Sequence, residues 1–343
     1  MSSPLGNDTS LFGGYKFDLS QFNFQDTSSN IPLVRIPCTI IIVLVLLTVA
    51  LRIVARLIYI HKIFFDDVLI IFAALFTVAL AAACIVSTTH GLGQHIWLLP
   101  LLDILEKLKR IVLDLYICQI LYACAIALTK LAIISSYFRF VPDQKFHTCM
   151  YVTMFPVVGL WVTGVFVTFF QCIPYYGAWE FTIERKCIDY VAYLYASSAV
   201  NVITDIALCV LPLPYFWRLD MSRKQRIILC MLLGGGASAC IVGMIRIGFL
   251  HNLHALDITY KSVPCLILSV SECSLGIISV SIPAIRPLAR QLFPAAMRGI
   301  TSPSSRARTR EIRLSSVPPS GNRVRMDADD KQKVSVSYGS SRS

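Results

Sequence analysis

Two residues of opposite charge, Lys130 and Asp205, lie deep inside long apolar stretches of the sequence. Each lies about eight residues before the predicted inner end of its stretch, which at about 1.5 Å per helical residue gives a depth of roughly 12 Å. Because an unpaired charge at that depth is costly, we expect the two side chains to pair across a helical bundle. Asn201 lies one turn from Asp205 on the same face and extends this predicted polar network.

A second set of ionisable residues, Asp114, Arg246 and Glu272, lies nearer the predicted outer face. Arg246 is about one turn from the outer end of its stretch, and Glu272 is about nine residues into the next one. The long stem of an arginine allows Arg246 to reach Glu272. Since ligand sites are cavities with a few convergent polar groups, we predict these three residues as candidates for a ligand pocket.

Each set has a structural and a functional interpretation. The buried pairs could serve only to hold helices together, because polar groups inside a membrane need partners. Alternatively, the Lys130–Asp205 pair is a switch that rearranges on activation, and the outer set binds a ligand. Replacing Lys130 with Met or Glu272 with Gln separates these interpretations, since only the functional one predicts altered signalling or binding with unchanged folding.

Retinal chemistry is not indicated. A retinal chromophore requires a lysine amine for a Schiff base. The last apolar stretch contains no lysine, because Lys261 precedes it in the connecting loop. Lys130 is the only lysine well inside a stretch, and its expected partner is Asp205. We therefore expect neither a bound chromophore nor any other cofactor.

Four histidines, in two connections predicted to share one side, allow one enzyme hypothesis: His90, His95, His251 and His254. Imidazole groups with a nearby carboxylate can hold zinc and activate water. The spacing is loose and no HExxH motif is present, so ordinary loop histidines are the simpler interpretation. We expect no metal and no enzymatic activity.

The composition is that of a membrane protein. The chain has 343 residues, of which 56% are hydrophobic and 15% charged, and its mean hydropathy is +0.67. A soluble domain has about 45–50% apolar and about 25% charged residues. The formal net charge of +11 is concentrated towards the C-terminus, and no motif supports nucleic-acid binding.

Seven stretches are long and apolar enough to cross a bilayer as helices, which predicts an all-α bundle. The predicted spans are 37–60, 68–88, 111–138, 149–171, 190–212, 226–250 and 263–285. They define three regions: an extracellular segment over 1–35, a membrane domain over 36–292, and a disordered basic tail, rich in Ser and Arg, over 293–343.

Basic residues indicate the orientation of the spans. Lysine and arginine favour the cytoplasmic side, and they are frequent in the first, third and fifth connections and in the tail. This predicts an outer N-terminus and a cytoplasmic C-terminus. Asn7 begins a glycosylation sequon that requires the same orientation. Cys172 and Cys187 then share an outer loop, where a disulfide can form.

The chain resembles the fungal rhodopsin-like integral membrane family, which includes the satratoxin-cluster membrane protein and the Pth-type receptors of plant-pathogenic fungi. The resemblance covers roughly residues 32–292 and implies seven helices, an outer N-terminus and a receptor-like architecture. The matching motifs are Gly91-Leu92-Gly93-Gln94-His95, Leu128-Thr129-Lys130-Leu131, Tyr137-Phe138-Arg139, Cys172-Ile173-Pro174, Trp179, Cys187-Ile188-Asp189, Asn201, Asp205, Leu211-Pro212-Leu213-Pro214, Trp217, Glu272, Pro283 and Arg286-Pro287-Leu288.

Two functions from different classes follow. The first is a receptor-like or sensor-like protein, expected in the plasma membrane, that recognises a small molecule or surface cue from outside. A cytoplasmic G-protein-type partner fits this architecture by analogy alone. The second is an accessory or transport protein of a secondary-metabolite pathway, as the resemblance allows. No internal repeat typical of transporters is present in the sequence.

Overall fold

The computed structural model describes the membrane domain and short parts on its N-terminal side. Its described residues are 28–59, 61, 64–98, 104–140, 143–180, 183–214, 223–250 and 258–292, with the backbone of the small strands β1 (Leu11–Phe12) and β2 (Tyr15–Lys16). Asn7, His251, His254 and the tail from residue 293 lie outside the described residues.

Within the described residues, seven helices are long and apolar enough to cross a membrane, which confirms the predicted fold class. These helices are α1 (Ile31–Tyr59), α2 (Phe65–His90), α3 (Ile104–Phe140), α4 (Gln144–Phe169), α5 (Tyr190–Val210), α7 (Arg223–Leu250) and α9 (Val263–Leu292). The orientation of the termini relative to a membrane stays a prediction.

Helix α3 begins well before its predicted start. It begins at Ile104 rather than near residue 111, and its 37 residues span about 55 Å at about 1.5 Å each, more than the roughly 30 Å of hydrocarbon. An ion pair of 2.8 Å between Arg110 and Glu106 spans one turn of this extension. The charged turn therefore continues the helix beyond the apolar stretch.

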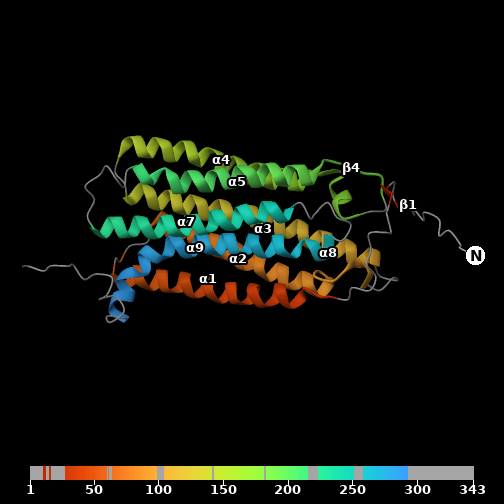
Figure 1. Cartoon of the computed structure of the whole chain (residues 1–343), viewed down its shortest axis with the longest axis horizontal. Helices are drawn as coiled ribbons and strands as arrows, with labels where there is room; N and C mark the ends of the chain where they lie inside the picture. Colours follow the sequence, from red (N-terminus) through yellow and green to blue (C-terminus); the bar gives the residue numbers. More distant parts are fainter. Residues whose placement is uncertain are drawn as a thin grey trace, which may run out of the picture. The chain divides into compact units, whose positions relative to one another are not determined.

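The seven helices form a closed ring. Helix α1 packs on α2 and α9, α4 packs between α3 and α5, and α7 packs between α5 and α9. Helix α3 also contacts α9 across the ring, so these two helices form the inside of the bundle. Figure 1 shows the resulting arrangement, with α4 and α5 on one side and α1 on the opposite side.

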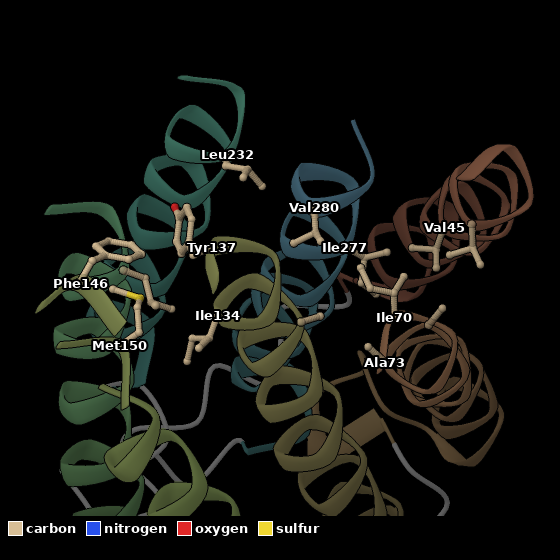
Figure 2. Close-up of a cluster of buried hydrophobic side chains, with 14 residues drawn as sticks. Val45, Ile70, Ala73, Ile134, Tyr137, Phe146, Met150, Leu232, Ile277 and Val280 are labelled. Carbon is tan, nitrogen blue, oxygen red and sulfur yellow. The ribbon is translucent and has the colours of Figure 1, made fainter. Parts of the chain in front are cut away.

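Apolar side chains fill the interior and also cover the exterior. Figure 2 shows one buried cluster in which Ile134, Tyr137 and Ile277 pack between the helices. Large apolar residues also lie on the outward faces, for example Phe155, which is 82% exposed, and Val152, which is 68% exposed. In water such a surface would be unfavourable, so the outward faces match the hydrocarbon of a bilayer.

Glycines permit the closest helix approaches. A β-carbon on Gly235 of α7 would collide with the side chain of Ser279 on α9. A β-carbon on Gly276 of α9 would collide with the side chain of Thr129 on α3. Small residues let helix backbones approach closely in membranes. These two positions therefore allow α9 to pack closely against both α3 and α7.

The connection after α2 closes one end of the bundle. Helix α2 ends at Gly91, which has a φ of 115°, and Gly93 follows with a φ of 91°. The backbone oxygen of Gly93 accepts from Asn30, and its N–H donates to Thr259. This connection therefore joins the start of α1 to the short helix α8 (Ile258–Lys261), which precedes α9.

Candidate functional site

The side chain of Lys130 forms a buried polar site between α3 and α5. Its Nζ donates to the backbone oxygen and the Oδ1 of Asn201 at 2.8 and 2.7 Å, and to Thr204 Oγ1 at 2.7 Å. The same Nζ lies 2.9 Å from Asp205 Oδ1. Helix α5 presents all these partners because residues three and four apart share one helical face. The structure thus brings Lys130, Asn201 and Asp205 together.

The network continues from α5 to α9 through Glu272. The Nδ2 of Asn201 donates to Glu272 Oε1 at 2.6 Å, and the hydroxyl of Tyr122 donates to Glu272 Oε2 at 2.9 Å. Glu272 is fully buried. We call Tyr122, Lys130, Asn201, Asp205 and Glu272 the central network. Two sets that the sequence placed apart are therefore joined, because Asn201 contacts both a cation and a carboxylate.

The predicted contact between Arg246 and Glu272 is wrong. Arg246 donates through Nη2 to Ser198 Oγ at 2.8 Å and through Nη1 to Ser269 Oγ at 3.3 Å. Its guanidinium carbon lies 4.5 Å from the ring centroid of Tyr122. The Tyr122 side chain contacts both groups, with its hydroxyl on Glu272 and its ring on the guanidinium. Among the described residues no carboxylate lies within ion-pair distance of Arg246, and its Nε has no hydrogen-bond partner.

The predicted place of Asp114 in the same pocket is also wrong. Asp114 Oδ2 lies 2.6 Å from His90 Nδ1, so this carboxylate faces α2 instead of α9. Asp114 lies two turns of α3 before Tyr122, about 12 Å along the helix at about 1.5 Å per residue. The rise along α3, together with the direction of the Asp114 side chain towards α2, therefore separates Asp114 from Arg246 and Glu272.

The described histidines lie in different surroundings. His90 faces Asp114, whereas the ring of His95 is stacked on Trp97 and Tyr260 with centroids 4.3 and 3.9 Å away. In the part of the chain that the structure describes, no three metal-binding side chains converge. The zinc hypothesis thus receives no support from His90 and His95.

A small cavity adjoins the central network. It lies between α3, α4 and α5, with Arg246 of α7 contributing to its wall, and has a volume of about 40 Å³. The polar lining includes Tyr122, Lys130, Asn201 and Arg246, and the apolar lining includes Val157, Leu160 and Trp161. Three residues of the central network, together with Arg246 and an apolar wall, therefore line one space. This cavity is the candidate binding site.

The connection between α4 and α5 lies at one end of the bundle and carries a disulfide. Cys172 in β3 (Cys172–Ile173) is bonded to Cys187 in β4 (Lys186–Cys187), and the two strands pair antiparallel. Trp179 in this connection packs edge-on against Tyr116 of α3, with ring centroids 5.5 Å apart. Figure 1 shows β4 and α8 at the same end of the bundle.

A cluster of four charged residues near the C-terminal end of α1 was not predicted as a site from the sequence. Arg52 pairs with Asp66 at 2.6 Å and with Asp67 at 2.8 Å. Arg56 lies 3.1 Å from Asp66 and 3.2 Å from Asp67, although its Nε is not aligned for a hydrogen bond. We call these four residues the end cluster. Arginines four residues apart in an apolar helix, followed by adjacent aspartates, were the available sequence signal.

The end cluster also contacts α9 and α3. Arg52 Nη1 donates to the backbone oxygen of Val280 on α9 at 2.5 Å. The link to α3 passes through Phe64, which precedes α2. The ring centroid of Phe64 lies 3.7 Å from the guanidinium carbon of Arg139 on α3 and 5.2 Å from that of Arg56. Val280 lies about 12 Å along α9 from Glu272 at about 1.5 Å per residue, so one helix connects the two charged sites.

Comparison with known sequences gives one family. The profile of the fungal rhodopsin domain matches residues 51–291, which include both the central network and the end cluster.

Three similar proteins come from filamentous fungi. The "Polyenoic acids biosynthesis gene cluster protein Ba17b" of Metarhizium anisopliae is 30% identical over 272 residues, which cover 76% of this chain and 74% of that protein. The "SAT4 family membrane protein" of Emericella nidulans is 26% identical over 196 residues, with coverage of 56% and 48%. The "Fugralins biosynthesis cluster protein 2" of Gibberella zeae is 26% identical over 211 residues, with coverage of 59% and 52%.

Proposed function

This chain belongs to the fungal rhodopsin domain family, and from that premise we propose that it is a receptor-like membrane sensor for a small molecule. The observation that carries the proposal is the shared wall of the cavity and the central network. Tyr122, Lys130 and Asn201 line the cavity and also hold the buried hydrogen bonds between α3, α5 and α9. A molecule in the cavity would compete for those bonds.

The proposed signal passes along α9. Asn201 is the residue that links Lys130 on α3 to Glu272 on α9. A ligand that displaces the amide of Asn201 would change the position of α9 relative to α5. The same helix carries the Val280 oxygen that binds Arg52 in the end cluster. A bound molecule can shift a conformational equilibrium only by its different affinity for the two states, and these bonds supply that difference.

The proposal places the end cluster at the cytoplasmic side of the plasma membrane, with a G-protein-type partner, and the N-terminus outside. It involves no enzymatic step and no retinal, since the amine of Lys130 has four acceptors around it. A sequon at Asn7 gives a direct check of orientation. Asn7→Gln should remove a glycosidase-sensitive mass shift, whereas a wild-type chain without such a shift provides no support for an outer N-terminus.

Partner capture in cells tests the sensor. A biotin ligase fused to the C-terminus should label different sets of proteins in wild type and in Lys130→Met. The control Lys145→Met, at an exposed lysine on α4, should label the wild-type set. Equal surface expression and monodisperse behaviour in detergent establish that the variant is folded. Identical labelled sets from a folded Lys130→Met protein would reject the switch.

A pathway-accessory role is the second candidate. It is favoured by two of the similar proteins, whose names refer to biosynthetic gene clusters. The same labelling experiment separates the two roles. Enrichment of G-protein subunits supports the sensor, whereas enrichment of biosynthetic enzymes that does not depend on Lys130 supports the accessory role.

A further inference from the structure

We propose that the cavity between α3, α4 and α5 binds the carboxylate of a lipophilic acid, and that the acid reaches the cavity from the membrane past α4. The inference rests on the proposed function for the choice of site, and it adds the chemical class of the ligand and its route. It depends on three features of the cavity: the state of Arg246, the volume, and the nature of the wall.

Arg246 is the buried cation without a carboxylate partner among the described residues. Only 7% of its surface is exposed, its Nη atoms bind the neutral hydroxyls of Ser198 and Ser269, and its Nε is unpartnered. Lys130, the other cation in the wall, is paired with Asp205. A buried guanidinium is stabilised by an anion, and its fork of N–H groups suits the two oxygens of a carboxylate. Glu272 acts on Arg246 only through space, because its oxygens bind Tyr122 and Asn201. The N–H groups of one guanidinium are therefore left to bind one carboxylate of a ligand.

The volume limits what the cavity itself can hold. At about 10–15 Å³ for each water-sized sphere, a cavity of about 40 Å³ accommodates about three such spheres. That space fits a carboxylate group and excludes a phospholipid headgroup. The remainder of the ligand must therefore lie outside the cavity, along the surface of the helices.

The wall indicates where that remainder lies. Leu160 and Trp161 of α4 line the cavity, and Trp161, which is 39% exposed, donates through its indole Nε1 to Cys124 Sγ of α3 at 3.4 Å. Tyr193 and Ser197 of α5 line the facing side. An apolar chain that passes these residues would stay in contact with the hydrocarbon, while its carboxylate meets Arg246. This arrangement favours a fatty or similarly lipophilic acid over a water-soluble one.

Photolabelling in nanodiscs tests the ligand class. The full-length protein in phosphatidylcholine nanodiscs is exposed to a twelve-carbon fatty acid with a terminal diazirine, or to its primary amide. We expect at least tenfold more labelling by the acid, with label on α4 and α5 peptides. Arg246→Met should reduce it at least tenfold and Arg246→Lys less. Equal labelling by the amide, or label confined to other helices, would overturn the proposal.

A second variant keeps the test valid if Arg246→Met does not fold. Ser197→Leu fills the cavity and leaves every charge in place, whereas Ala196→Leu makes the same change at an exposed neighbouring position. We expect loss of labelling only in Ser197→Leu, and equal labelling of the two variants would count against the cavity. Nanodiscs with phosphatidylglycerol form a further arm, in which competition by this anionic lipid would assign the site to a membrane headgroup and overturn the proposal.

The results distinguish this inference from the sensor role. Specific labelling by the acid, together with unchanged partner capture in Lys130→Met, leaves the ligand class standing and removes the sensor. Absence of acid labelling, together with altered partner capture, removes the ligand class and leaves the sensor.

Discussion

The central network and the end cluster both bury charged side chains, but neutral groups make more of the contacts to those charges in the central network than in the end cluster. In the end cluster each arginine contacts two aspartates, and the described cavity does not reach it. In the centre, Lys130 contacts one carboxylate and three neutral acceptors, and Glu272 binds a phenol and an amide. A cavity adjoins Lys130 and Asn201. Neutral partners can be exchanged at lower cost than ionic ones, so the centre is suited to rearrangement and the end cluster to fixing helices.

The largest expected effect is the loss of Arg52. Arg52→Met leaves two buried aspartates with one arginine and removes the bond to Val280, and breaking a buried pair in this way costs about 3–5 kcal/mol. Denaturant unfolding in detergent should show that loss. Arg110→Met, which removes an exposed arginine of α3 from a one-turn ion pair, serves as the control and should change stability by less than about 0.5 kcal/mol. A near-neutral Arg52→Met would remove the fixing role of the end cluster.

The Lys130–Asp205 pair should show a smaller cost that is recovered in a double variant. Lys130→Met alone leaves a buried carboxylate and should cost about 2–3 kcal/mol, and Lys130→Met with Asp205→Asn should regain at least half of it. A double-variant cycle of unfolding free energies measures the coupling. If the free-energy costs of the two single variants simply add, Lys130 and Asp205 are not coupled. The central network would then lack the strong ionic pairing that the end cluster shows.

Much of the fold could be predicted from the sequence because the bilayer imposes one-dimensional rules. Every backbone group of a span must be bonded within its helix, so apolar stretches of sufficient length identify the spans. The rise per residue then gives depth, which brought Lys130 and Asp205 to one level. The depth of a residue can be estimated without knowing which helices are its neighbours. The prediction that Lys130 and Asp205 lie at one level depended on depth alone.

Both errors involved helix rotation, and Asp114 also lies about 12 Å along α3 from Tyr122 at about 1.5 Å per residue. A helix that is apolar on most faces gives little information about which face points inward, so Asp114 could not be assigned to α2 nor Arg246 to the serines. The ring of Tyr122 contacts Arg246 and its hydroxyl contacts Glu272. This arrangement depends on how α3, α7 and α9 pack together, which the sequence alone does not give. The spacing of Arg52 and Arg56 and the adjacent aspartates that follow indicated a paired cluster, which was not predicted.

Removing the hydroxyl of Tyr122 should have an intermediate effect and separate binding from stability. Tyr122→Phe leaves the ring under Arg246 but removes a donor from Glu272, which costs about 1–3 kcal/mol for a buried charged acceptor. Unfolding in detergent measures that cost. The change should leave acid labelling within a few-fold of wild type, because the cation is unaltered. Loss of labelling in a folded Tyr122→Phe protein would show that Glu272 and Arg246 act as one unit.

The smallest expected effect concerns Arg139, which connects α3 to the end cluster without a carboxylate contact among the described residues. Its guanidinium lies over Phe64, and Arg139 is exposed, where such an interaction contributes about 0.5–1 kcal/mol. Arg139→Gln should therefore barely change unfolding in detergent. If α3 is the element that the sensor releases at this end, the same variant should alter partner capture as strongly as Lys130→Met does, despite its small effect on stability. Unchanged capture would exclude the Arg139 contact of α3 from the signal and leave α9, through Val280 and Arg52, as its route.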